Sequence, residues 1–410
     1  MRSLALAFWL LFASITVAQS DINQPPIRYG QTRGDNPVTR LFDQVREGGV
    51  TLPYRRQDGH LKSILEALEI PTTSQSLVYS KTSLQSSRIS PQNPRAIYFN
   101  DDVYVGWVQG SSLLEIATAD TTLGTAYYTV RMTADGPSMR RHNEACLACH
   151  LTPKKSGRIP GHSIRSVATR SNGKINLLLD SFKTTHASPF KERWGGWYVT
   201  GDVGAMNHRG NAFLEGEDIQ PPDGGRRVDL SSDFDTSRWP SPHSDVVALM
   251  VLEHQTYAHN ELTRASYDMR RAQHDGDAEV VREAIETISE RLAGVLLFDD
   301  EAPLPGPVTG STPFADEFAA RGPFDRKGRS LREFDLKTRV FRYPCSYLIY
   351  SPVFDALDAD LKERIYERML EKLIATDSDK DAGPEKAAIL EILRDTKSDL
   401  PKSWTVGLDG

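Results

Sequence analysis

The chain has 410 residues, of which 39% are hydrophobic and 25% are charged, and its formal net charge is −6. These values are typical of a globular protein with one large domain or two ordinary ones. The mildly acidic charge argues against non-specific nucleic-acid binding, and we expect no nucleic-acid partner.

Residues 1–18 have the pattern of a signal peptide. Arg2 supplies the positive charge, residues 4–17 form an apolar run, and Ala18 is a small residue at the expected cleavage site. The run is too short to span a membrane comfortably, although an uncleaved anchor is the alternative. We therefore expect a periplasmic or otherwise exported protein with no integral membrane segment in its mature part. Residues 19–38 follow as a loose, polar N-terminal segment.

A mixed α/β region is expected at residues 39–243. Within it, residues 39–69 have the apolar spacing of a helix. Short runs rich in β-branched and aromatic residues follow at 76–132, separated by turn residues, and this pattern favours an antiparallel meander. Further strands are expected at 176–180 and 197–200.

The second half of the chain is expected to be mainly helical. Helices are expected at 244–273, 277–297, 357–375 and 384–396. The first two belong to a region at 244–298 that packs on the preceding one, and a connector rich in Pro and Gly spans 299–330. A C-terminal helical region occupies 331–410. The predicted fold class is therefore α+β, with a β-rich N-terminal half and a mainly helical C-terminal half.

The segment Cys146-Leu147-Ala148-Cys149-His150 has the spacing of a c-type haem attachment motif. Two thiols about one helical turn apart can add to the two vinyl groups of one porphyrin. The next residue, His150, can then bind the iron from the proximal side. The motif occurs once, so we expect one covalent haem c, held by Cys146, Cys149 and His150.

Other interpretations of the two cysteines stay open. A zinc knuckle needs a second ligand pair at matching spacing, and the remaining Cys345 is far away in the sequence. A thioredoxin-like pair needs a βαβ setting, which the flanking sequence does not supply. A disulfide between residues three apart is strained and gains little from loop closure. Apolar residues surround Cys345 itself, and we expect it to be a buried free thiol.

The distal ligand of the iron has four candidates. His208 is preferred, because it lies in a loop with several glycines that can approach the haem closely. Met206 lies in the same loop, and the rivals His254 and His259 lie on the helix expected at 244–273. A thioether or an imidazole suits an electron-transfer haem, whereas a vacant position permits small-molecule binding or peroxide chemistry.

An aromatic cluster and a basic loop are further candidates for contact with the haem. The cluster comprises Arg193, Trp194, Trp197 and Tyr198. These residues could form one side of the haem site, although ordinary core packing is an equal alternative. The basic loop at 152–165 could contact the haem propionates or an acidic redox partner, or could simply be solvated.

Several segments resemble a family of exported bacterial single-haem c-type cytochrome-like proteins, which is largely uncharacterised. The resembling segments are 93–106, 146–150, 193–201, 252–255 and 341–350. The run His208-Arg209-Gly210-Asn211 matches a His-x-Gly-Asn pattern of that family, whereas Val203 stands where a second histidine is expected. The resemblance implies covalent haem binding and does not imply a substrate.

These features predict a haem protein of periplasmic electron transfer, in which the iron accepts and passes one electron. The first alternative is a haem enzyme, peroxidase-like or another small-molecule oxidoreductase, because a simple carrier needs far fewer residues to wrap one haem. The second alternative is a haem-based sensor. The expected partner is accordingly a redox partner protein or a small molecule.

Overall fold

The structure is a computed structural model. It describes residues 21–152, 156–176, 178–179, 181–216, 218–219, 225–375 and 384–404. The expected signal peptide at 1–18 lies outside the described residues. The N-terminal segment, expected to be loose up to residue 38, is packed where it is described, because Ile22, Ile27 and Tyr29 are buried.

An antiparallel six-stranded sheet forms the centre of the molecule. Its strands are β1 (Ser76–Val78), β2 (Arg95–Phe99), β3 (Val103–Val108), β4 (Leu113–Asp120), β5 (Gly124–Thr133) and β6 (Gly136–Arg141). They pair in sequence order, which confirms the expected meander. All residues of β3 are buried, so both faces of the sheet are covered at its middle.

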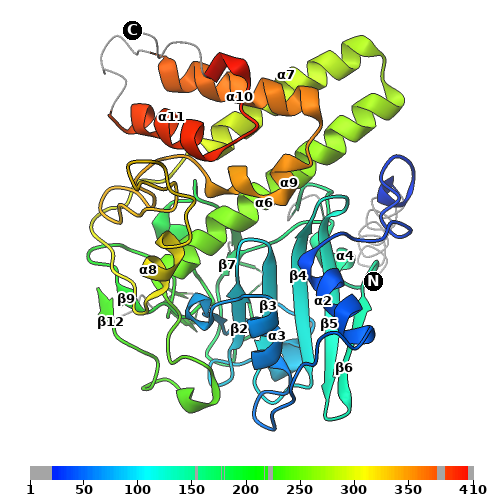
Figure 1. Cartoon of the computed structure of the whole chain (residues 1–410). Helices are drawn as coiled ribbons and strands as arrows, with labels where there is room; N and C mark the ends of the chain where they lie inside the picture. Colours follow the sequence, from blue (N-terminus) through cyan, green and yellow to red (C-terminus); the bar gives the residue numbers. More distant parts are fainter. Residues whose placement is uncertain are drawn as a thin grey trace, which may run out of the picture.

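Two short helices, α2 (Pro37–Arg46) and α3 (Leu61–Ala67), cover one face of the sheet and lie in front of the strands in Figure 1. One continuous helical stretch at 39–69 is therefore wrong. The chain is not helical between the two helices, where Gly48 and Gly59 have φ angles of 77° and 63°. These left-handed conformations suit glycine and end a helix.

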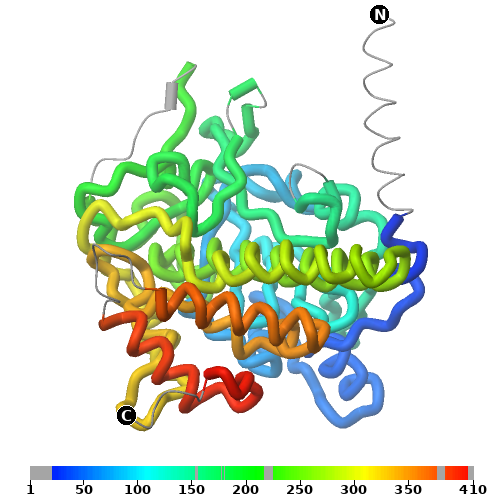
Figure 2. Tube along the Cα trace, turned by 90° about the horizontal axis from the view of Figure 1, so that it is seen from above, coloured from blue at the N-terminus to red at the C-terminus, as the bar shows by residue number. Residues whose placement is uncertain are grey.

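The long helix α6 (Val246–Asp275) crosses the other face of the sheet, as Figures 1 and 2 show. Asp245 caps it, accepting hydrogen bonds from the backbone N–H groups of Val247 and Ala248. Nearly every side chain in the first half of α6 is buried, because the sheet packs on one side and the C-terminal helices on the other. The helix expected at 244–273 is thus confirmed.

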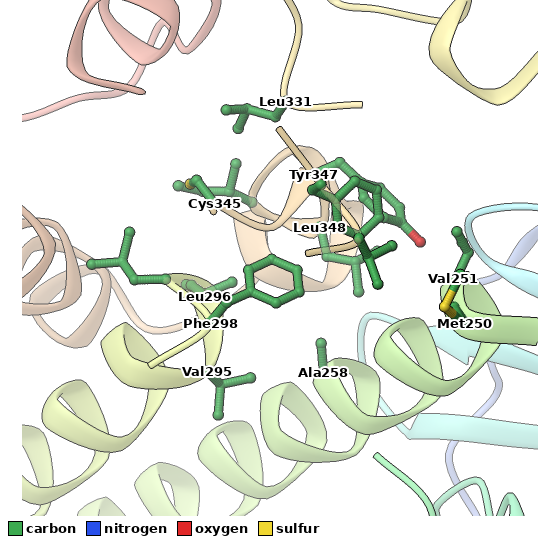
Figure 3. Packing of buried hydrophobic residues seen from close by; sticks show 14 of the residues in the cluster. Met250, Val251, Ala258, Val295, Leu296, Phe298, Leu331, Cys345, Tyr347 and Leu348 are labelled. Atoms are coloured by element: carbon green, nitrogen blue, oxygen red, sulfur yellow. The ribbon is translucent and has the colours of Figure 1, made fainter. Parts of the chain in front are cut away.

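The C-terminal helices gather on the side of α6 that faces away from the sheet (Figure 1). They are α7 (Ala278–Leu296), α9 (Pro352–Asp355), α10 (Ala359–Ile374) and α11 (Pro384–Thr396). The short helix α8 (Phe314–Ala319) lies apart from them, beside the sheet, and the Phe314 ring centre is 5.7 Å from that of Phe99 on β2. Figure 3 shows Cys345 within this core, near Leu296 and Leu331. Cys345 is fully buried as a free thiol, which confirms that expectation.

The segment between the sheet and α6 contains short elements. They are α4 (Leu147–His150), β7 (Arg165–Val167), β8 (Ser181–Lys183), β9 (Gly201–Asp202), β10 (Leu214–Glu215), β11 (Asp218–Ile219) and β12 (Arg226–Arg227). Of the strand expected at 176–180, residues 177 and 180 lie outside the described residues, and β8 begins at Ser181. At 197–200 the chain makes two isolated bridges, through Trp197 and Thr200, instead of a strand.

Short 3₁₀ helices complete the described secondary structure. They are η1 (Thr72–Ser74), η2 (Ser86–Arg88), η3 (Phe190–Glu192), η4 (Thr236–Arg238), η5 (Tyr347–Tyr350) and η6 (Lys402–Trp404). A sheet in the first half and helices in the second make the fold α+β, as predicted. Across the described ranges, no helix combines the length and apolar character needed to cross a bilayer.

Candidate functional site

A pocket of about 250 Å³ lies between the sheet, the α4 turn and α6. Cross-strand neighbours form its floor, because side chains of paired residues point to the same face of a sheet. One row consists of Ile97, Gly106, Glu115 and Thr129, and the next of Tyr104, Ala117 and Tyr127. From the opposite side, α6 contributes Leu252 and Thr256, which are four residues apart and share one helix face.

The attachment motif forms one wall of this pocket. Cys146, Cys149 and His150 all line it, with Cys146 half-buried and Cys149 exposed. The turn is anchored by Leu147, whose side chain is buried, and by a 2.9 Å hydrogen bond from the backbone N–H of His150 to the Cys146 carbonyl. The structure therefore places both thiols and the imidazole around one space, as the motif requires.

Asn143 is a residue type that caps helices, and its position before the motif predicts it as the cap of this turn, but in the structure it does not cap it. The N-cap position belongs to Cys146, and the Asn143 amide donates to the Gly30 carbonyl at 3.3 Å. The expected helical turn is confirmed, but its start lies closer to the motif than the sequence suggests.

A backbone carbonyl fixes the orientation of the His150 ring. His150 Nδ1 lies 2.9 Å from the Gly161 carbonyl oxygen, which also accepts from the Tyr127 hydroxyl at 2.7 Å. Because a carbonyl can only accept, Nδ1 carries the proton, and in the neutral ring the lone pair lies on Nε2. A backbone carbonyl that holds one nitrogen while the other faces a metal is the usual arrangement of iron-binding and zinc-binding histidines.

The Cys146 thiol differs from a catalytic one. Burial, with smaller contributions from the nearby Glu115 and Cys149, raises its pKa to about 11. Redox-active cysteine pairs have lowered thiol pKa values instead, since the thiolate is the reactive form. The setting is also a four-residue helical turn after an antiparallel edge strand, not a βαβ unit. Both observations argue against the thioredoxin-like interpretation.

Among the described residues, no group of three or more His, Cys, Asp or Glu side chains is arranged to hold a metal ion. An iron inside a porphyrin needs at most two protein ligands, so this finding does not bear on a haem. It leaves the zinc interpretation without a ligand set in the described part of the chain.

His162 also lines the pocket, and the sequence analysis did not single it out. Its side chain is 5% exposed, and its ring centre lies 4.4 Å from that of Tyr104. Burial lowers the pKa of His162 well below its usual value, and the nearby His259 and His150 lower it further, so the ring is neutral. The preceding Gly161 packs closely on α6, since a Cβ atom there would come within 2.6 Å of Asn260 Oδ1, and no local sequence pattern reveals this contact.

His259 lies directly behind His162, with ring centres 6.0 Å apart. His259 Nδ1 is 2.8 Å from the Tyr104 hydroxyl, which itself accepts a hydrogen bond from Gln255 Nε2. Gln255 also donates to the Asn100 carbonyl, and this fixes which end of its amide carries the hydrogens. His259 Nε2 is buried without a hydrogen-bond partner in the part of the chain that the structure describes.

Polar side chains occupy one edge of the pocket. Arg95 and Glu115 form an ion pair of 3.0 Å, and Gln85 donates to the same carboxylate. Two further atoms at the wall, Arg95 Nε and Ser163 Oγ, are buried with no hydrogen-bond partner among the described residues. Buried polar atoms without partners are uncommon, so these mark a place where an acceptor group can bind.

The structure does not bring His208 and Met206 to the attachment motif. Both line a separate pocket of about 830 Å³, whose described lining includes neither of the motif cysteines nor His150. His208 Nδ1 accepts a hydrogen bond of 3.0 Å from the Gly210 backbone, and its ring packs edge-on against Trp194. Burial lowers the pKa of His208 to about 4. In this arrangement His208 is held by its own loop.

His254 likewise does not line the pocket. Its Nδ1 is 2.8 Å from His186 Nδ1, and its Nε2 is 2.7 Å from Ser346 Oγ, so both ring nitrogens are engaged. The preceding residue, Glu253, is fully buried and accepts from Arg193 at 2.9 Å. Burial raises the pKa of Glu253 to about 7, although Arg193 opposes this.

The aromatic cluster that includes Trp194, Trp197 and Tyr198 packs in the core and does not belong to the pocket lining. Ordinary packing is therefore the better description of this cluster. In the basic loop at 152–165, Lys154 and Lys155 lie outside the described residues, and Arg165 donates to Ser181.

The chain matches no family model, and comparisons with curated proteins and with solved structures found no match either.

Proposed function

We propose that the chain carries one haem c, joined to Cys146 and Cys149 and ligated by His150, and that it transfers electrons outside the cytoplasm. The observation that carries the proposal is the shared pocket of the two thiols and the imidazole. The carbonyl of Gly161 supports it, because it holds His150 in the tautomer that an axial ligand needs.

The pocket residues fit a haem in character. The walls are apolar or aromatic near the motif, through Tyr127, Ile116 and Ile164. Two donors of the lining, Arg95 Nε and Ser163 Oγ, have no hydrogen-bond partner among the described residues, and the propionate groups of a haem can satisfy them. Apolar cover around the macrocycle and charged contacts at its edge both influence the potential of a haem iron.

Electron transfer is the favoured role, because the pocket is small and open at its rim. Pockets for drug-sized ligands begin at about 300 Å³, so a macrocycle attached here extends past the enclosed part. The rim contains the exposed Cys149 and Leu84, of which Leu84 is 61% exposed. When bound, the haem iron supplies one-electron redox chemistry, and the rim residues provide an apolar contact for a redox partner.

The test is haem staining after denaturing electrophoresis, with the protein expressed alongside the c-type maturation machinery. Wild type is expected to keep its haem, and a variant with Cys146→Ala and Cys149→Ala is expected to lose it completely. Cys345→Ala is the matched control, since that buried thiol lies in the C-terminal core and its variant is expected to stain like wild type. An unstained wild-type band would refute the proposal.

The His150→Ala variant tests the axial role. Without the imidazole, the iron loses its proximal base, and the low-spin absorption spectrum is expected to disappear or the haem to attach poorly. An unchanged spectrum with full attachment would show that another residue ligates the iron on that side.

A further inference from the structure

We infer that His162 is the second axial ligand of the haem iron, in place of the sequence-based candidate His208. This inference rests on the proposed function, since it assigns a residue at the same site. It begins with the observation that His150 and His162 line one pocket, whereas His208 lines another.

The chain geometry explains how two imidazoles reach the same space. After His150 the chain forms a loop whose far end returns to the motif. There the Gly161 N–H donates to the His150 carbonyl at 3.1 Å, and the Gly161 carbonyl accepts from His150 Nδ1. His162 is the residue after Gly161. The two histidines are therefore fixed relative to each other by hydrogen bonds at the neck of one loop.

Helix α6 holds His162 in place. The side chain of Asn260 accepts from the His162 N–H at 2.7 Å and donates to the His162 carbonyl at 2.9 Å. Both bonds are made to the backbone, so they fix the backbone position of His162 and leave its ring nitrogens without a bond to Asn260. Ligands held by rigid elements keep their geometry better than ligands on loops.

Within the described ranges, the His162 ring makes no short hydrogen bond. Its Nε2 lies 3.5 Å from Thr125 Oγ1, which is longer than an ordinary hydrogen bond. By contrast, hydrogen bonds of 2.8 and 2.7 Å engage both nitrogens of His254. Because its hydrogen bond to Thr125 is weak, the His162 ring can ligate an iron at little cost in free energy. His254 would first have to break its two short hydrogen bonds.

His259 is the nearest rival, because its buried Nε2 has no partner among the described residues. However, His259 lies behind His162 and does not belong to the pocket lining. Tyr104, which does line the pocket, bonds to its Nδ1 and packs on the His162 ring. His259 thus supports the Tyr104 and His162 rings from behind.

The experiment records ferric electron paramagnetic resonance and absorption spectra of the mature haem protein and its variants. Wild type is expected to be low-spin with a two-imidazole signature. His162→Ala is expected to lose that signal, become high-spin and bind carbon monoxide in the ferrous state. His208→Ala and His254→Ala are expected to keep the low-spin signal unchanged. His259→Ala removes only the support behind the His162 ring, so the iron is expected to stay low-spin with a broadened signal.

A conservative variant guards against misfolding. His162→Met is expected to stay low-spin, to show the spectrum of thioether ligation and to shift the midpoint potential upward, since a Met/His pair raises the potential of a haem. If His162→Ala fails to fold, this variant and the wild-type signature decide the matter.

The outcomes separate the two proposals. A covalent haem whose low-spin signal survives in His162→Ala, or a wild-type iron that is already high-spin, overturns the assignment of His162 and leaves haem attachment intact. Loss of the signal in His208→Ala or His259→Ala, but not in His162→Ala, overturns it as well. A wild-type protein without covalent haem overturns both.

Discussion

Helix α6 carries two buried histidines five residues apart, His254 and His259, and they belong to two different kinds of site. His254 lies in a closed cluster, with both ring nitrogens hydrogen-bonded and the buried ion pair of Arg193 and Glu253 beside it. His259 lies next to the attachment pocket, with one ring nitrogen lacking a partner among the described residues. The His254 ring is therefore committed to contacts within the fold, whereas the His259 ring packs against Tyr104 and His162, which line the pocket.

The difference shows why a histidine in a sequence is a weak sign of ligation. His254 and His208 look suitable by residue type, but each already has hydrogen bonds within the protein. At and beside the pocket, Arg95, Ser163 and His259 each have a buried polar atom without a partner among the described residues, although such atoms also occur elsewhere in the fold, for example at Glu253 Oε1. Because buried groups without partners cost free energy, the two atoms that line the pocket, Arg95 Nε and Ser163 Oγ, are available to a bound group there.

The largest effect is expected in the closed cluster, from Arg193→Met. This change leaves the fully buried Glu253 without its cation and is expected to cost about 3–5 kcal/mol of unfolding free energy near neutral pH. The cost should be smaller at pH 5, because the pKa of Glu253 is already raised to about 7 and the carboxyl can protonate. Denaturant unfolding at the two pH values measures this.

The double variant Arg193→Met with Glu253→Leu is the control. Replacing both charges by apolar groups is expected to recover part of the lost stability, since no charge is left buried alone. If the single and double variants are equally unstable, lost packing is the cause and the closed cluster is not held by charge pairing.

The second prediction concerns acid stability and His186. Burial lowers the pKa of His186 from 6.5 to about 4, so the unfolded chain takes up this proton at a higher pH than the folded protein does. The stabilising contribution is therefore complete above pH 6.5 and is lost as the pH falls toward 4. Between pH 7 and pH 4, wild type is expected to lose about 3 kcal/mol more than His186→Gln.

The stability of wild type is compared with that of His186→Gln because Glu253 changes the stability with pH in the opposite direction to His186. The raised pKa of Glu253 makes the folded state gain stability as the pH falls from 7, and that effect is common to both proteins. Parallel stability profiles of wild type and His186→Gln would contradict the assigned role of His186.

The smallest stability effect is expected at the pocket, from Asn260→Ala. This variant removes the two hydrogen bonds to the His162 backbone and is expected to cost about 1–3 kcal/mol, because a buried N–H and carbonyl lose their partner. In the haem-loaded protein it should also broaden the low-spin signal, since the His162 ring is held less firmly. Asn172→Ala, at an exposed turn, is the control and should change stability by less than about 0.5 kcal/mol.

Local patterns made much of the fold predictable. Val103 to Val108 reads as a buried strand because β-branched and aromatic residues follow one another, and the long helix after Ser244 has both its apolar spacing and its Asp245 cap in the sequence. The short elements after the motif were less predictable. Residues 197–200 have strand-like composition, but single bridges to distant segments determine their conformation, and such partners leave no local signal.

The grouping of Cys146, Cys149 and His150 was predictable from the sequence, whereas the approach of His162 to the same pocket was not. The difference is how far apart in the chain the interacting residues lie. Cys146, Cys149 and His150 are close in space because they are close in sequence. His162 reaches the pocket through the loop neck at Gly161 and through Asn260, which is 98 residues away in the chain. The neighbouring glycines favoured His208 as a ligand, but the backbone freedom of a loop does not predict which part of the fold the loop contacts.

Mass spectrometry of proteolytic fragments tests the central claim most directly. The protein is expressed with its export signal and the c-type maturation machinery, and it is then digested with a protease. The account predicts that the fragment containing residues 146–150 is heavier by one haem, bound through both Cys146 and Cys149. Fragments in which both cysteines carry no haem would contradict the account.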